Sequence, residues 1–156
     1  MFGKPVSAYL KFQKVVLLIL FVVGLTRLGL SMSGAPNSAV RWVSINAVVW
    51  TAAIYYGVAV YKTGFGTYRH LLPLVFFQTV AFQIVAVLGI LLAMGGMNNI
   101  FAAPEYTFGA SPGLHLTGHL TIGLVAPTLI HWGLSSLVML ITKAVSKSPA
   151  PQRAGA

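Results

Sequence analysis

The chain has 156 residues, of which 57% are hydrophobic and 7% are charged, a composition typical of a membrane-embedded protein rather than of a soluble domain. It carries ten Lys and Arg against one acidic residue, Glu105, and it has no cysteine. These counts exclude catalysis by paired carboxylates, carboxylate cages for metal ions, thiolate metal sites and cysteine nucleophiles.

Four long apolar segments predict an all-α membrane protein with four antiparallel transmembrane helices in an up-down bundle. The predicted spans cover about residues 15–33, 40–61, 71–94 and 115–142. Residues 1–145 are predicted to form a single domain, and residues 146–156 a disordered tail. A cleaved signal peptide is the alternative for the first span, but Arg27 and Pro36 follow its apolar core and weigh against cleavage.

The basic residues lie at the ends of the apolar segments and not together on one polar surface, although the net charge is +9. This distribution favours contact with anionic lipid headgroups and argues against nucleic acid as a partner. Most of them fall in the amino-terminal lead, the segment 62–70 and the carboxyl tail. By the positive-inside rule, both termini are predicted to be cytoplasmic, and the connection 95–113 to face the opposite side.

Four polar side chains inside the predicted spans are expected at a similar depth. An α-helix rises about 1.5 Å per residue, which places Arg27, Asn46, Gln83 and His119 within one to two helical turns of a common level in the outer half of the bilayer. Polar residues in membrane spans face the protein interior and mark functional sites. The sequence therefore predicts a polar cluster beneath the connection 95–113.

The last span holds three of the four histidines and a proline. His115 and His119 share a helix face at i, i+4 and could supply half of a metal site, whereas an interfacial pair is the simpler interpretation. His131 lies about 18 Å below His119 along the axis, so one flat cofactor cannot bind both. Pro127 removes a helical hydrogen bond and permits a kink just above His131, because it frees the carbonyl of Gly123.

His131 has two interpretations. It is either a neutral imidazole bonded to a neighbouring helix, with Gln78 or a freed carbonyl as partner, or the single histidine ligand of a haem or chlorophyll. Arg27 likewise either extends to the headgroups or pairs with Glu105, or it holds an anionic group or a quinone oxygen. Asn46 and Gln83 serve either as bonds between helices or as ligand contacts.

The sequence shows no motif for hydrolase, nucleotide or zinc-protease chemistry, so catalysis by this chain alone is not expected. We expect an accessory or structural subunit of a larger redox or energy-converting complex in a bacterial inner membrane, in contact with lipid and with other subunits or further copies. The first alternative is a haem-, pigment- or quinone-binding protein of the cytochrome type. Its candidate cofactor-binding residues are His119, His131, Arg27, Asn46 and Gln83. The second alternative is a small-solute or ion transporter.

Overall fold

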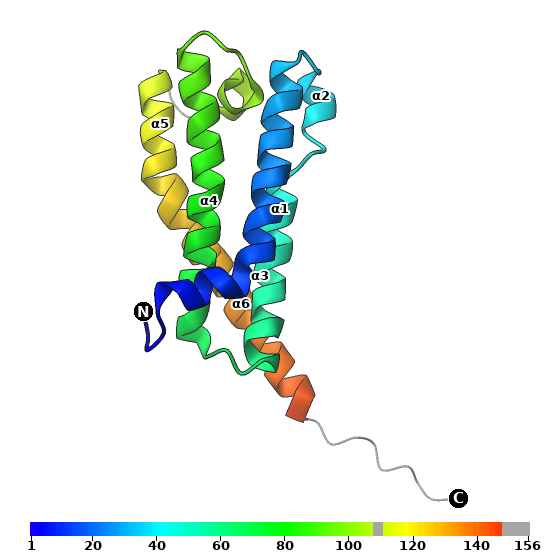
Figure 1. The fold of residues 1–156 in the computed structure, drawn as a ribbon, viewed down its shortest axis with the longest axis vertical. Coiled ribbons are helices and arrows are strands. Elements are labelled where there is room, and N and C mark those ends of the chain that lie inside the picture. The colour runs from blue at the N-terminus through cyan, green and yellow to red at the C-terminus, as the bar shows by residue number, and fades with distance from the viewer. Residues whose placement is uncertain (108–110, 148–156) are drawn as a thin grey trace, which may run out of the picture.

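The computed structural model describes residues 1–107 and 111–147, and all regular structure in these ranges is helical. In chain order the elements are α1 (Val6–Met32), α2 (Asn37–Val40), α3 (Ile45–Lys62), α4 (Tyr68–Met94), the 3-10 turns η1 (Ile100–Ala102) and η2 (Pro104–Tyr106), α5 (Pro112–Leu120) and α6 (Ile122–Lys147) (Figure 1). Four segments are long and apolar enough to cross a membrane: Val6–Met32, Asn37–Lys62, Tyr68–Met94 and Pro112–Ser146. The prediction of an all-helical chain with four segments long and apolar enough to span a membrane is confirmed for the described residues.

Figure 1 shows α2, α5 and the turn region after α4 at the top of the view, and we call this the upper end. The amino terminus, the loop between α3 and α4, and the end of α6 lie toward the bottom, which we call the lower end. α4 is the central element, because it contacts α1, α3, α5 and α6. The tail predicted for residues 146–156 lies, from residue 148 onward, outside the described residues.

The helices differ from the predicted spans at three places. α1 begins at Val6 instead of residue 15, because Tyr9 and Gln13 are buried in the bundle while Lys11 and Lys14 remain exposed. The second span contains two helices, since α2 ends at Val40 and α3 starts only after Ser44. The fourth span begins at Pro112 and is interrupted at Thr121, where one continuous helix over 115–142 was predicted.

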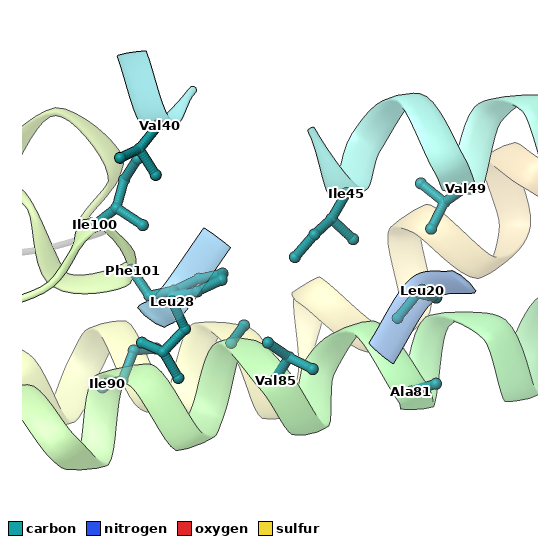
Figure 2. Close-up of a cluster of buried hydrophobic side chains, with 11 residues drawn as sticks. Leu20, Leu28, Val40, Ile45, Val49, Ala81, Val85, Ile90, Ile100 and Phe101 are labelled. Atoms are coloured by element: carbon teal, nitrogen blue, oxygen red, sulfur yellow. The ribbon is translucent and has the colours of Figure 1, made fainter. Parts of the chain in front are cut away.

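A hydrophobic cluster in the upper half joins α1, α3 and α4 to the short helical segments above them. Figure 2 shows its buried side chains, which are Leu20, Leu28, Val40, Ile45, Val49, Ala81, Val85, Ala86, Ile90, Ile100 and Phe101. Gly24 permits this packing, because a Cβ at that position would lie 3.0 Å from a methyl group of Val85. The cluster fixes the upper halves of α1 and α4 against each other.

α3 and α6 cross in the lower half of the bundle at small residues. A Cβ at Gly57 would lie 2.5 Å from the carbonyl oxygen of Ser135, so only glycine fits there. The Ser135 hydroxyl donates to the carbonyl of Ala53 at 2.8 Å, on the same face of α3 one turn earlier. Small residues permit close helix packing in membranes. Ala53 and Gly57, spaced i, i+4, lie on one face of α3 and make this contact with α6.

Candidate functional site

The interruption of the fourth span creates an unusual hydrogen-bond acceptor near the upper end. Thr121 leaves helical geometry (φ −116°, ψ −90°), and α6 starts at the next residue. Pro127 lies inside α6 and has no N–H with which to bond the carbonyl of Gly123. The chain therefore changes direction at Thr121, above the kink expected at Pro127, and the Gly123 carbonyl is left without its helical donor.

The side chain of Gln83 in α4 supplies the missing donor to the Gly123 carbonyl. Its Nε2 donates to the Gly123 carbonyl, and its Oε1 lies 2.7 Å from Nδ1 of His119. The carbonyl oxygen can only accept, so it fixes which end of the Gln83 amide faces it. Oε1 is then the acceptor, and Nδ1 of His119 carries the proton that it donates. Gln83 thus links α5, α4 and α6 through one amide group.

These residues border a cavity of about 720 Å³ between the upper parts of α3 and α6. All four residues predicted to share a level line it, since Arg27, Asn46, Gln83 and His119 all border this space. The remaining lining consists mainly of apolar groups from α3, α4, η1, α5 and α6, which are Ile45, Phe82, Ile100, Phe101, Gly118, Ile122, Gly123, Ala126 and Pro127. The cavity therefore combines apolar walls with a few polar groups.

Arg27 and Glu105 bring opposite charges to this lining. Nη1 of Arg27 donates to the carbonyl of Val43 at 3.4 Å, and the guanidinium carbon lies 5.8 Å from the ring centre of Phe101. Glu105 accepts from Nδ2 of Asn37 at 2.9 Å. A backbone hydrogen bond at Glu105, followed by this bond from Asn37, lowers the pKa of the Glu105 carboxyl. Glu105 is therefore a carboxylate at neutral pH.

The loop after α4 forms one wall of the cavity and is attached at two places. Asn99 donates from Nδ2 to the carbonyl of Gly89 at 2.7 Å, and its Oδ1 accepts from the Phe101 amide at 3.0 Å. The Ile100 amide donates to the Ser31 hydroxyl of α1 at 2.7 Å. A Cβ at Gly89 would lie 2.6 Å from the ring of Phe101, so glycine allows this ring to pack on α4.

His131 does not belong to this cavity. It is buried near the middle of α6, and its ring meets the Trp50 ring edge-on at 4.9 Å between centroids. Its Nδ1 has no hydrogen-bond partner within residues 1–107 and 111–147. Gln78, the partner considered from the sequence, donates instead to the Val49 carbonyl at 3.1 Å. The structure thus separates His131 from the other four candidate residues.

His115 has a structural role beside the cavity. It is buried, and its Nε2 donates to the carbonyl of Phe101 at 2.9 Å. The His115 and His119 rings lie edge-to-face with centroids 4.8 Å apart. No group of three or more His, Cys, Asp or Glu side chains suited to a metal ion occurs in the described part of the chain.

Comparisons with models of protein families, with curated proteins and with solved structures gave no match. The interpretation of the site therefore depends on the chain's own chemistry. Sequence reasoning named Glu105 only as a possible partner of Arg27, and it did not place Phe101 or Phe82 on the site. The only available signal for the first two was their position in the aromatic connection above the predicted polar level.

Proposed function

We propose that this protein binds a small amphipathic molecule, of the quinone or pigment cofactor type, in the cavity between the upper parts of α3 and α6. The observation that supports the proposal is the convergence of Arg27, Asn46, Gln83 and His119 on one cavity with otherwise mostly apolar walls. Small-molecule sites are concave and mainly apolar, contain a few orienting polar groups, and have volumes of about 300–1,000 Å³. A volume of about 720 Å³ lies in this range.

We further infer that the four spans alternate in direction and that both termini are cytoplasmic. The lower end supports this orientation, because Lys4 lies in the lead, Lys62 at the end of α3 and Arg69 in the first turn of α4. Basic residues near the ends of membrane spans are retained on the cytoplasmic side. In this orientation the cavity lies in the outer half of the membrane, where a lipid-soluble molecule reaches it from the bilayer.

A matched pair of substitutions tests the binding proposal. Ala126→Phe places a ring in the cavity, whereas Val125→Phe changes a neighbouring side chain that is 58% exposed on the outside of the bundle. The proteins are purified in mild detergent, extracted with organic solvent, and analysed by mass spectrometry and visible absorption. The wild type and Val125→Phe are expected to retain the same extracted compound, and Ala126→Phe to lose at least about tenfold, since overpacking excludes it.

Equal recovery from the two phenylalanine variants contradicts the location of the site. Failure of the wild type to retain or rebind any quinone, pigment or lipid contradicts the proposal itself. Thermal melting of each variant in detergent verifies that loss of the compound does not result from unfolding.

The accessory-subunit role, the bacterial inner membrane and the transporter alternative stay predictions. Co-purification with a second membrane protein supports the first of them and is compatible with a ligand in the cavity. Uptake of a solute into liposomes that persists in an Asn46→Leu/Gln83→Leu double variant excludes these two residues as a transport route.

A further inference from the structure

The first residues of the chain lie across the lower end of the bundle. Figure 1 shows the first turns of α1, in the darkest blue, running across the long axis of the bundle before the helix turns upward. Residues 1–14, which we call the amino-terminal lead, precede the uninterrupted apolar run of α1 that begins at Val15. A helix that lies along a membrane surface has this direction, whereas a spanning helix runs parallel to its neighbours.

The amino-terminal lead is attached to the loop between α3 and α4 and to the first turn of α4. The ring centroids of Tyr9 and Phe12 lie 5.5 and 4.2 Å from that of Phe65, and Tyr9 is fully buried. Nε2 of His70 lies 3.1 Å from the carbonyl oxygen of Phe2, which can only accept, so this nitrogen donates. These contacts hold the lead in one orientation, and its outward side chains keep a fixed arrangement.

The outward face of the lead has an apolar edge and a basic edge. Val6 and Leu10 are 44% and 41% exposed and lie one helical turn apart. Ser7, Lys11 and Lys14 are also exposed, and their spacing of four and three residues places them together beside the apolar edge. An amphipathic helix in a membrane interface has this pattern, because its apolar side enters the acyl chains while its basic side faces the headgroups.

No acidic side chain lies near this face. Lys62 at the end of α3 and Arg69 in the first turn of α4 are exposed at the same end of the bundle. Glu105, the only acidic residue of the chain, belongs to η2 at the upper end. The positive charges of Lys11 and Lys14 are therefore not neutralised by a carboxylate side chain. A basic surface beside an apolar edge is complementary to a lipid that combines a phosphate with acyl chains.

We propose that the amino-terminal lead is a membrane-surface helix that binds anionic phospholipid, with Val6 and Leu10 among the acyl chains and Lys11 and Lys14 at the headgroup phosphates. The occupant is a phospholipid and not a soluble anion, because a free phosphate would leave the apolar edge in water. In the orientation inferred above, the lead meets the cytoplasmic leaflet, whose anionic lipids give it a negative surface potential. The site is independent of the cavity, which lies at the other end of the bundle.

The first test measures lipid selectivity on the purified full-length protein in a non-ionic detergent. Phosphatidylglycerol and phosphatidylcholine with the same acyl chains are titrated, and bound lipid is counted by native mass spectrometry. Phosphatidylglycerol is expected to bind at least about tenfold more tightly, since each of the two lysines contributes about a factor of five toward an anionic lipid. Equal affinities for the two lipids overturn the proposal.

Lys11→Gln and Arg41→Gln form the matched variant pair, because each removes one exposed positive charge, at the lower and the upper end respectively. Lys11→Gln is expected to weaken the binding of phosphatidylglycerol about fivefold. Arg41→Gln is expected to keep the wild-type affinity. An unchanged affinity in Lys11→Gln, or an equal loss in both variants, overturns the location of the site on the lead.

The second test measures how deeply each edge of the lead lies in the membrane. The chain has no cysteine, so Val6→Cys and Lys11→Cys each accept one spin label, at positions about 140° apart around the helix. In vesicles that contain phosphatidylglycerol, the label on Val6→Cys is expected to be more accessible to oxygen, and that on Lys11→Cys to a water-soluble nickel complex. Leu18→Cys, at a 64% exposed position in the apolar run, provides the reference for the acyl region. Equal, water-like accessibility at both positions of the lead overturns its placement in the membrane surface.

Discussion

α3 and α6 meet in two different ways along their length. In the lower half Gly57 brings the backbones so close that a Cβ would contact the Ser135 carbonyl, and the Ser135 hydroxyl bonds to Ala53. In the upper half the same helices are separated by the cavity of about 720 Å³. Below the cavity, the Tyr56 hydroxyl donates to Oε1 of Gln13 at 2.9 Å inside the bundle.

The same two helices therefore form a close contact in the lower half and border a cavity in the upper half. Membrane helices gain no hydrophobic stabilisation from packing together in lipid, so small residues and hydrogen bonds determine where they touch. The small residues are placed at the lower contact. At the upper end Ile45 of α3 and Ile122 of α6 line the cavity, together with small residues of α5 and α6. The lower contact should therefore carry stability, and the upper lining leaves the space in which we propose that a ligand binds.

The largest effect is expected from Gly57→Val. Its side chain would overlap the Ser135 carbonyl and Val138, whose Cβ would lie 2.7 Å from the new Cβ. Overpacking against backbone should lower the free energy of unfolding by about 3 kcal/mol, measured by denaturation in mixed micelles. Gly133→Val is the control, because a Cβ at Gly133 meets nothing within 4 Å. Equal losses in the two variants would show that the crossing does not depend on close approach.

A second comparison uses the two buried glutamines of α4. Gln83→Leu removes the donor to the Gly123 carbonyl and the acceptor of the Nδ1 proton of His119. We expect about 2 kcal/mol lower stability. Gln78→Leu should have an effect below about 1 kcal/mol, since the Val49 carbonyl lies inside α3 and keeps its helical donor. Denaturation of both variants checks this, and a larger loss from Gln78→Leu would contradict it.

Pro127→Ala should alter the hydrogen bond of Gln83 more than stability. The new N–H at position 127 competes with Gln83 for the Gly123 carbonyl, so the amide and the His119 tautomer are less strictly fixed. The side-chain amide signals of Gln83 are expected to shift in NMR spectra of protein labelled with nitrogen-15 at Gln, because the bond from Nε2 to the Gly123 carbonyl weakens. Pro73→Ala serves as the control, because Pro73 lies near the lower end of α4. Unchanged Gln83 signals in Pro127→Ala would show that the missing N–H of Pro127 does not determine this bond.

The smallest effect concerns Glu105, and Asn37→Ala should raise its pKa toward the ordinary value. The backbone hydrogen bond remains, so part of the lowering should persist. A lowered pKa in the folded state contributes stability above the unfolded-state pKa, and this contribution is lost as the pH falls through the folded-state value. Because the chain has no other Asp or Glu, carbon-13 labelling of Glu isolates this titration by NMR. Ser38→Ala is the control, and an unchanged pKa in Asn37→Ala would exclude the Asn37 bond as a cause.

The sequence was sufficient to predict the helical class and the gathering of four polar residues. Apolar length identifies a span, and a fixed rise per residue converts position into depth. Arg27, Asn46, Gln83 and His119 were expected at one level, and all four line the cavity. Their role toward a cofactor stays a prediction.

The remaining features depend on contacts that periodicity does not contain. Pro127 predicts a weakened helix but not that the break falls at Thr121. The break is accompanied by a hydrogen bond from Gln83 on the neighbouring helix to Gly123, and a sequence pattern does not contain this contact. The early start of α1 depends on buried contacts of Tyr9 and Gln13 that are absent from a hydropathy pattern. Glu105 borders the cavity because the loop after α4 folds into two short 3-10 turns, and hydrophobic periodicity does not predict such a loop.

The attachment of the loop after α4 has a consequence for how the cavity fills. Asn99 fastens this loop to Gly89, and the Ile100 amide fastens it to Ser31 on α1. If this loop moved aside to admit a ligand, both of these hydrogen bonds would have to break. Entry between α3 and α6 breaks neither of them and should therefore require less free energy. Occupancy by the proposed ligand should then follow its concentration in the bilayer rather than its concentration in the aqueous phase. Shorter-tailed analogues should accordingly lose apparent affinity through partitioning, even where their contacts with the protein are identical.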